Sequence, residues 1–561
     1  MRKNLNIFFT IVVLITGCGK LNREKSFKDI SQLPILKIEI GAADFDSIIK
    51  NQHYKAEAYL TLISSQGDTL YNDYIKHIKG RGNSTWGRKK PFTIKLNRRE
   101  RLLGLHKEKT FCLLSNGTDE SHIRNAIAFD IARLIGMDAP LYEYVLLYIN
   151  GDYKGLYIIT NKVDVGKYGV NITDLDRENQ YVNNYDLKEY QRYEYGCMKH
   201  PLDETLNEYE AGSSKGVILE NNPDDISGGY LLNVGYNGYY KSISGFVSPF
   251  KQYVRIESPK YASKEEVEYI SSYFNRIASC IAYLGVDDDL KELEKYLNLD
   301  SYVRFYLLNE IFLNIDGGQN SFYMYKEQGD NYINAGPVWD FDLSLNNSAA
   351  IGECFLPNQI WMDKIDTASA NLAYESPIWF HQLWRNKCFK EKTSYMYINE
   401  ISPLLHEYIN SDTVENLISK LRYAAQQEKI VGCDNNVATY QEATDKAITF
   451  LKKRIDFFDW YFQAAPEEIV CITDVTKGRA ETSWRYYLPR GERITMPSYI
   501  YVGGFWNNSP SPVWFYANTD SVIQNGTVIQ SEITIERRLI PPSGHDVLYR
   551  KVKKVLHKVF S

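Results

Sequence analysis

Two acidic stretches lie close together in the middle of the chain, NEIFLNIDGGQNSFYMY at residues 309–325 and GPVWDFD at residues 336–342. Residues 299–313 have the periodicity of a helix, so Asp316 comes just after a predicted helix. Two glycines and Gln319 separate Asp316 from Asn320 at the start of the next predicted strand. Because this turn begins without bulky neighbours, both side chains can reach one pocket.

Residues 332–339 have strand character, and we expect Asp340 and Asp342 to continue that strand. Period-2 spacing then points both carboxylates to the same face, where they meet Asp316 and Asn320. Mg²⁺ prefers carboxylate and amide oxygens together with substrate phosphates. Protein kinases place an aspartate, a nearby asparagine and a later aspartate in this order. The alternative is that acids beside glycines only form turns or cap helices.

Strand patterns dominate the chain before these stretches. Apolar and polar residues alternate at residues 35–40, 55–63 and 91–96. A helix is predicted at residues 121–135, and Asn150-Gly151-Asp152 predicts a hairpin between strands at 143–149 and 153–160.

Helical patterns dominate later, at residues 263–284 and from 377 to 462, whereas the polar segment 168–216 is interpreted as a surface excursion. Past Pro466 the chain changes to short strands, for example 499–502 and 513–516. The predicted fold class is α+β, with an antiparallel sheet region followed by a helical region and a small C-terminal β-domain. The predicted boundaries are 34–465 and 466–561.

The N-terminus indicates export. Arg2 and Lys3 precede an apolar run, residues 7–15, that is too short to span a bilayer. The run ends in Leu14-Ile15-Thr16-Gly17-Cys18, which resembles the lipobox of bacterial lipoproteins. We therefore expect a signal peptide at residues 1–17, a lipid on Cys18, a tether at 18–33, and an extracytoplasmic, membrane-anchored protein of the bacterial cell envelope. The alternative is a conventional signal peptide with an incidental cysteine.

The net charge bears on nucleic-acid binding, and the cysteine spacing bears on disulfides and zinc sites. The formal charge of −5 gives no global basic field for a phosphate backbone, so we expect no nucleic-acid partner. Seven of the 8 cysteines lie after Cys18, scattered with no close pair, and this favours free thiols over a disulfide framework or a zinc site.

Several ordered blocks together resemble the CotH kinase family, which is named for a spore coat protein and has an atypical, secreted, kinase-like core. The resemblance covers roughly residues 34–465. It is carried by Lys79-Gly80-Arg81-Gly82-Asn83-Ser84-Thr85-Trp86 with Lys89 to Lys95, Arg124-Asn125, Ile149-Asn150-Gly151-Asp152-Tyr153-Lys154-Gly155-Leu156-Tyr157, Gly228-Gly229-Tyr230-Leu231-Leu232, Ile256-Glu257-Ser258-Pro259 and the two acidic stretches.

The resemblance implies a kinase that uses ATP and Mg²⁺ or Mn²⁺ to transfer the γ-phosphoryl group to serine or threonine of a protein substrate. Asp316 is then the catalytic residue, Asn320 and Asp340 are metal ligands, and Asp342 replaces or assists Asp340. Arg81 and Lys95 are candidates for phosphate contacts, with a solvated strand charge as the alternative for each. The same alternative is favoured for Lys90.

Two positions depart from the family pattern. Asn161 and Asn233 stand where family members usually have glutamate. Either change removes an ion pair of the kind that active kinases need, or both amides are structural and lie away from the nucleotide. The chain is therefore an active surface kinase or an inactive kinase-like scaffold that acts as a binding or adhesion protein. A polysaccharide-capture lipoprotein is a third reading, but it leaves the acidic stretches unexplained.

Overall fold

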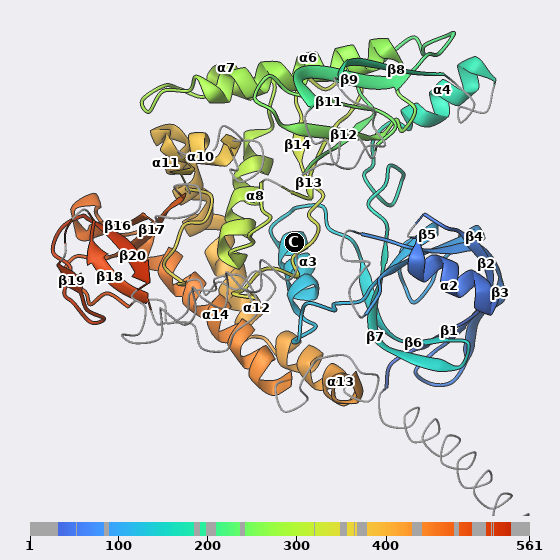
Figure 1. Cartoon of the computed structure of the whole chain (residues 1–561), viewed down its shortest axis with the longest axis horizontal. Helices are drawn as coiled ribbons and strands as arrows, with labels where there is room; N and C mark the ends of the chain where they lie inside the picture. Colours follow the sequence, from blue (N-terminus) through green and yellow to red (C-terminus); the bar gives the residue numbers. More distant parts are fainter. Residues whose placement is uncertain are drawn as a thin grey trace, which may run out of the picture.

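The computed structural model describes residues 32–51, 53–82, 89–184, 191–197, 209–235, 242–318, 320–347, 356–363, 365–366, 378–428, 440–475, 482–495, 512–517, 519 and 521–539. The signal peptide, Cys18, most of the tether and the predicted strand 499–502 lie outside these ranges. Figure 1 shows three groups of strands around a central set of helices. The α+β class is confirmed.

The first strands close into a barrel, which the sequence analysis did not predict. Antiparallel ladders give the order β1-β2-β3-β4-β5-β7-β6, and a parallel ladder between β1 and β6 closes the ring. Apolar side chains that alternate along the strands fill its interior. The strands are β1 (Ile35–Glu39), β2 (Ala56–Ile63), β3 (Thr69–Gly80), β4 (Phe92–Glu100), β5 (Glu108–Leu114), β6 (Tyr142–Ile149) and β7 (Asp152–Asn161), with helices α2 (Ala42–Lys50) and α3 (Arg124–Leu134).

A second sheet of seven strands has the order β14-β13-β10-β12-β11-β9-β8. The polar segment 168–216 is thus more than a surface excursion, because it supplies a helix, the edge strand β8 and most of its neighbour β9. The strands are β8 (Arg192–Cys197), β9 (Tyr209–Val217), β10 (Tyr230–Val234), β11 (Gly245–Val247), β12 (Tyr253–Ser258), β13 (Phe322–Lys326) and β14 (Asn334–Ala335). The helices of this part are α4 (Leu175–Asn183), α6 (Lys264–Ala282), α7 (Lys291–Glu294) and α8 (Leu299–Phe312).

Helices and a third sheet complete the chain. The helical region comprises α10 (Ile378–Arg385), α11 (Lys387–Met396), the π-helix Tyr397–Ile401, α12 (Ser402–Asn410), α13 (Thr413–Gln427) and α14 (Tyr440–Tyr461), followed by the 3₁₀ turn Pro466–Glu468. The third sheet has the order β15-β17-β16-β20-β18-β19. Its strands are β15 (Ile365–Asp366), β16 (Ile469–Val475), β17 (Thr482–Pro489), β18 (Pro512–Tyr516), β19 (Val522–Ile523) and β20 (Ile533–Leu539), so one short strand comes from before residue 466.

A cluster of buried aromatic rings packs α8 between the second sheet and the helical region. Phe305 on α8 contacts Phe322 on β13 (4.5 Å between ring centroids) and Phe380 on α10 (5.6 Å). This packing holds α8 in place, and α8 leads directly into the turn that carries Asp316.

The described helices and cysteines bear on membrane crossing and on disulfide bonding. None of the described helices combines the length and the apolarity that crossing a bilayer requires. Among the described residues, Cys112, Cys280, Cys388 and Cys471 are free thiols.

A buried glutamate caps helix α6. Glu266 Oε2 accepts hydrogen bonds from the backbone N–H of Ser263 (2.7 Å) and from Nδ2 of Asn179 on α4 (3.0 Å). Burial raises the pKa of Glu266 to about 7 from an ordinary value of 4.5, although these hydrogen bonds lower it. The folded chain therefore binds a proton more tightly than the unfolded chain.

We expect Glu266→Gln to remove one component of the pH dependence of stability. A carboxyl whose pKa is higher in the folded chain than in the unfolded chain stabilises the fold fully when the pH is below its unfolded pKa. This contribution is lost as the pH rises through the folded pKa, and for Glu266 it amounts to about 3 kcal/mol of unfolding free energy. The stability of the variant relative to the native chain should rise between pH 5 and pH 8 in urea unfolding. Glu265→Gln, at the exposed neighbouring position, is the control. A Glu266→Gln difference that stays constant with pH contradicts the assignment.

Candidate active site

The turn after α8 holds Asp316 in a fixed place. Leu313 adopts a left-handed conformation (φ 43°), and Asn314 Nδ2 donates to Asn309 Oδ1 (3.0 Å), which closes the turn onto the helix. A Cβ on Gly317 would lie 2.7 Å from the same Asn309 oxygen, so a larger residue does not fit there. The glycine is needed for close approach.

A buried ion pair anchors the end of α8 from the opposite side. Arg454 on α14 donates through Nε to the backbone oxygen of Glu310 (3.0 Å) and through Nη2 to Glu310 Oε2 (3.3 Å). The Glu310 carboxylate also accepts from the N–H groups of Trp361 (2.9 Å) and Met362 (2.5 Å). Trp361 Nε1 donates in turn to the backbone oxygen of Ile315, next to Asp316 (3.1 Å).

Asn320 lies beside Asp316, as the sequence predicts. Its backbone N–H donates to the backbone oxygen of Asp316 (2.9 Å), and the side chains of the two residues form a hydrogen bond with each other. Gly235, just past β10, leaves room for the amide, since a Cβ there would lie 2.8 Å from Asn320 Oδ1. The next residue, Ser321, donates to Asp340 Oδ2 (2.9 Å), which brings the second acidic stretch to the first.

The prediction that Asp340 and Asp342 continue a strand is wrong. β14 comprises only Asn334–Ala335, and Pro337 lacks the N–H that a continuing ladder needs. Asp340 has a left-handed backbone (φ 69°), so it and Asp342 belong to a loop. Asn125 on α3 holds this loop, because its Oδ1 accepts from the N–H of Phe341 (2.8 Å).

A threonine that the sequence analysis missed contacts Asp342. Thr118, in the loop between β5 and α3, donates from Oγ1 to Asp342 Oδ2 (2.6 Å). Asn347 Nδ2 bridges the backbone oxygens of Thr118 (2.8 Å) and Asp342 (2.6 Å). Thr118 stands outside the blocks that carry the family resemblance, so no signal in the sequence marked it.

A second buried ion pair fixes the same loop. Arg124 on α3 pairs with Asp119 and donates through Nε to the backbone oxygen of Ser344 (2.9 Å). Burial alone would raise the pKa of Asp119, but Arg124 and the Ser121 hydroxyl hold it below its usual value. Asp119 is therefore a charged anchor, and the Arg124-Asn125 block joins the barrel side to the loop of Asp340 and Asp342.

The three carboxylates repel one another. Burial and repulsion by Asp340 together raise the pKa of Asp316 to about 7, and the hydrogen bond from Asn320 opposes the shift. Burial and Asp340 also raise the pKa of Asp342, to about 8, while the Thr118 hydroxyl opposes this. A bound cation would relieve this repulsion.

The donor set fits a divalent cation that is shared with a ligand. In the part of the chain that the structure describes, no group of three or more His, Cys, Asp and Glu side chains is placed to hold a metal ion by itself. Mg²⁺ does not require such a cage, because it keeps several waters and binds through one or two carboxylates and substrate phosphates. Carboxylates with an adjacent amide, as at Asp316, Asn320 and Asp340, supply that kind of site.

Of the two basic candidates, Arg81 lies next to the acidic cluster. Its guanidinium lies 5.1 Å from the ring centroid of Trp339, the residue before Asp340. Lys95 lies on β4, and the charges that act on it come from Lys76, Asp164 and neighbouring lysines. The structure thus places the two candidates in different surroundings.

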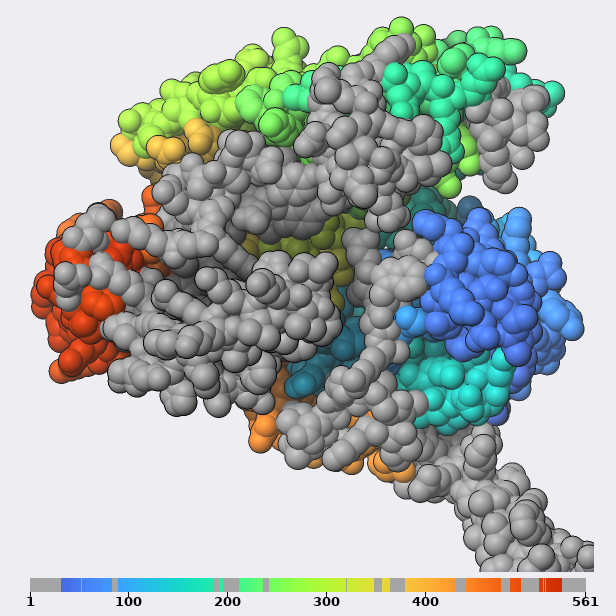
Figure 2. All heavy atoms as spheres, in the orientation of Figure 1, coloured from blue at the N-terminus to red at the C-terminus, as the bar shows by residue number. Residues whose placement is uncertain are grey.

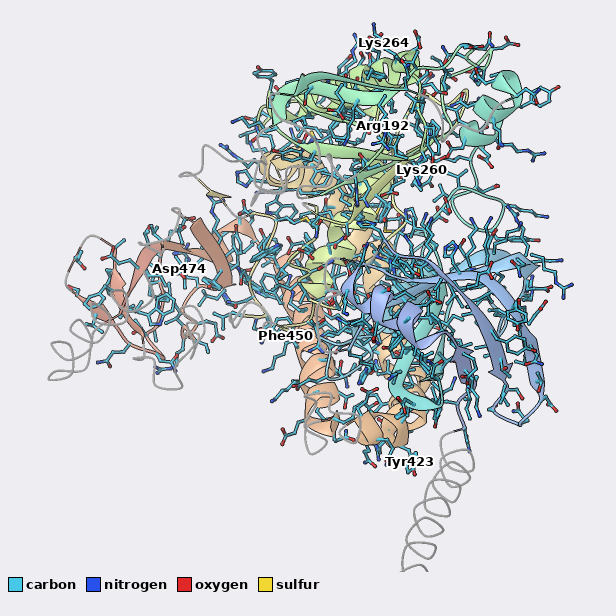
Figure 3. All side chains as sticks on the ribbon, turned by 45° about the vertical axis from the view of Figure 1, so that its right-hand side comes forward. Arg192, Lys260, Lys264, Tyr423, Phe450 and Asp474 are labelled. Atoms are coloured by element: carbon cyan, nitrogen blue, oxygen red, sulfur yellow. The ribbon has the colours of Figure 1, made fainter. Side chains whose placement is uncertain are left out.

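A lysine cluster that the sequence analysis missed lines the space between the barrel and the second sheet. It consists of Lys55, Lys79, Lys162 and Lys260. Burial lowers the pKa of Lys79 and of Lys260, and repulsion within the cluster lowers it further. Lys162 keeps 42% of its side-chain surface exposed. Figure 2 shows a hollow between these two parts, and Lys260 lies on the side of the second sheet that faces the barrel (Figure 3).

The two amides that depart from the family pattern have different surroundings. Asn161 accepts from the N–H of His106 (3.1 Å) and donates to the oxygen of the same residue (3.2 Å). A glutamate carboxylate accepts hydrogen bonds but cannot donate one, so it cannot make both bonds. Asn161 therefore has a structural role, in which its side chain fixes the backbone of His106. Asn233 is 1% exposed and pairs across the second sheet with Arg255 and Tyr323.

A comparison with known protein families assigns the chain to one of them. The family model described as CotH kinase protein matches residues 77–458, which include both acidic stretches, Arg81 and the Arg124-Asn125 block. No curated protein matches the chain in a sequence comparison. Because the family model covers more than half of its length, the chain belongs to the CotH kinase protein family.

Proposed function

We propose that the chain is a protein kinase that transfers the γ-phosphoryl group of ATP to a serine or threonine of another protein, with Mg²⁺ or Mn²⁺ as cofactor. The observation that carries the proposal is the meeting of Asp316 and Asn320 with Asp340 and Asp342, which arrive from a separate loop. This is the donor set of a kinase-like core, in which catalysis consists of positioning and charge stabilisation.

Each residue has a distinct role in this proposal. Asp316 orients the acceptor hydroxyl and receives its proton, while Asn320 and Asp340 hold the metal ion, assisted or replaced by Asp342. The metal ion supplies charge neutralisation for the phosphates. Arg81 lies over Trp339, the residue before Asp340, and we assign it the first contact with the triphosphate. The lysine cluster extends this positive surface away from the metal.

We also propose that the protein acts outside the cytoplasm, anchored by a lipid on Cys18. The support is the sequence pattern at residues 1–18 alone. A lipid at Cys18 leaves a tether of about 15 residues before β1, long enough for the folded part to reach acceptor proteins near the membrane surface.

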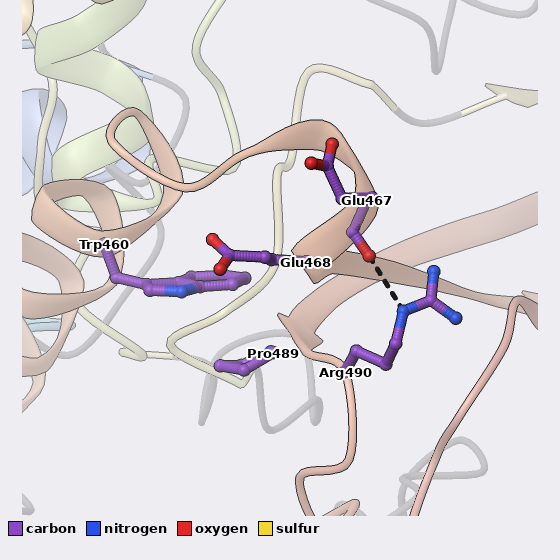
Figure 4. A pocket seen from close by; sticks show the side chains of 5 residues that line it. All are labelled: Trp460, Glu467, Glu468, Pro489 and Arg490. Carbon is purple, nitrogen blue, oxygen red and sulfur yellow. Dashed lines mark hydrogen bonds between the residues drawn. The ribbon is translucent and has the colours of Figure 1, made fainter.

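A binding function is the second candidate, and one pocket favours it. A depression of about 590 Å³ lies where α14 meets the third sheet, lined by Trp460, Glu467, Glu468, Pro489 and Arg490 (Figure 4). An indole ring beside charged side chains suits recognition of a partner at the C-terminal part of the chain. Nucleotide binding separates the candidates, because a pure binding protein does not need it.

We expect Asp316→Asn to lower phosphoryl transfer by at least about a hundredfold, the usual contribution of a positioned base, and to leave ATP binding nearly unchanged. The assay counts label from γ-labelled ATP on the protein itself and on generic acceptor proteins. Asp152→Asn, in a hairpin turn where the aspartate side chain is 73% exposed, is the control. Unchanged turnover in Asp316→Asn refutes its role.

We expect Asp340→Ala combined with Asp342→Ala to weaken the binding of MgATP by more than about tenfold, since even indirect changes around a metal site cost 10- to 100-fold in affinity. Binding of ATP without metal should change much less. Calorimetry with and without Mg²⁺ measures both. Equal MgATP affinity in the native and variant chains means that the metal lies elsewhere.

A further inference from the structure

A buried ion pair joins the barrel to the helical region outside the acidic cluster. Lys89 Nζ lies 2.8 Å from Glu428 Oε1 and donates to the backbone oxygen of Leu156 on β7 (2.6 Å). The two charged side chains are 4% and 0% exposed. Lys89 precedes β4, whereas Glu428 is the residue that ends α13, so the pair connects segments that are 339 positions apart.

The surroundings keep Glu428 charged. Burial alone would raise the pKa of Glu428, but Lys89, His122 and the N–H of Leu156 hold it below its usual value. Glu428 reaches β7 only because residue 155 is glycine, where a Cβ would lie 2.5 Å from Glu428 Oε1. The glycine of the Lys154-Gly155-Leu156-Tyr157 block is therefore a requirement of this ion pair.

Residues 89–91 are linked to the acidic cluster through two neighbouring segments. On one side, Gly117 packs against Lys89, since a Cβ on Gly117 would lie 3.3 Å from the Lys89 oxygen. The next residue, Thr118, donates to Asp342 (2.6 Å). On the other side, the oxygen of Pro91 accepts from the N–H of Arg81 (3.3 Å), whose guanidinium covers Trp339.

We propose that Lys89 and Glu428 are positioning residues, which hold residues 89–91 against the helical region and so set the places of Thr118 and Arg81 at the reacting centre. The inference rests on the proposed function. Lys89 is satisfied inside the protein by Glu428, Leu156 and the ring of Tyr157 (4.9 Å), so it orders the site without contacting phosphate. The chain therefore has a buried lysine–glutamate pair, although Asn161 and Asn233 stand where family members usually have glutamate.

The test is Glu428→Gln in the full chain, with Glu415→Gln as control on the same helix, where the glutamate side chain is 71% exposed. We expect faster amide hydrogen exchange in peptides that cover residues 114–123, measured by mass spectrometry. We also expect kcat to fall by about tenfold or more, as small displacements of catalytic groups do, while KM for ATP changes less than about twofold. Glu415→Gln should change neither quantity.

A Glu428→Gln variant with native exchange and native kcat overturns the proposal. If the native chain neither binds nor uses ATP, the proposed function fails, and the exchange data still decide whether the pair orders the Thr118 loop. Should Glu428→Gln fail to fold, Lys89→Met with Glu428→Leu replaces the pair by apolar side chains, a change that is often neutral for stability. A folded double variant with low kcat and fast exchange supports positioning, and one with native values of both overturns it.

Discussion

The repulsion among Asp316, Asp340 and Asp342 is the constraint on which the arrangement of the chain depends. Asp340 raises the pKa of both Asp316 and Asp342, and carboxylates that repel in this way separate unless the backbone segments that carry them are fixed independently. The turn after α8 and the loop after β14 are fixed by groups outside the cluster, among them Asn125 and Trp361. The acids are therefore held close by the fold and not by mutual attraction.

Buried ion pairs do much of this fixing. Arg454 with Glu310 anchors the end of α8, Arg124 with Asp119 anchors the loop of Asp342, and Lys89 with Glu428 joins the barrel to α13. Replacing a whole buried pair by apolar residues is often harmless to stability, whereas breaking one leaves an uncompensated charge. Such pairs thus specify one arrangement of segments. In this chain they lie around the reacting centre that we propose.

The sequence predicts local features of this site better than distant ones. The Asn150-Gly151 turn, helix α3 and the approach of Asn320 to Asp316 follow from short patterns, and all are present. Barrel closure depends on the parallel ladder between β1 and β6. The alternation of apolar and polar residues within each strand does not show which distant strand it pairs with. The loop of Asp340 escaped prediction because Pro337 ends the strand and a left-handed residue follows. The sequence shows Lys89 only as part of a motif, because its ion-pair partner Glu428 is 339 positions away.

The acidic cluster also bears on the choice between an active kinase and a scaffold. A buried carboxyl whose folded pKa is raised lowers the stability of the folded chain as pH rises towards that pKa. A scaffold gains nothing from such groups, and replacing Asp316 or Asp342 by asparagine would relieve the repulsion. Destabilising arrangements of this kind persist where function needs them. The amide at Asn161 does not weigh against activity in the same way, because its side chain is fully used in hydrogen bonds with the backbone of His106.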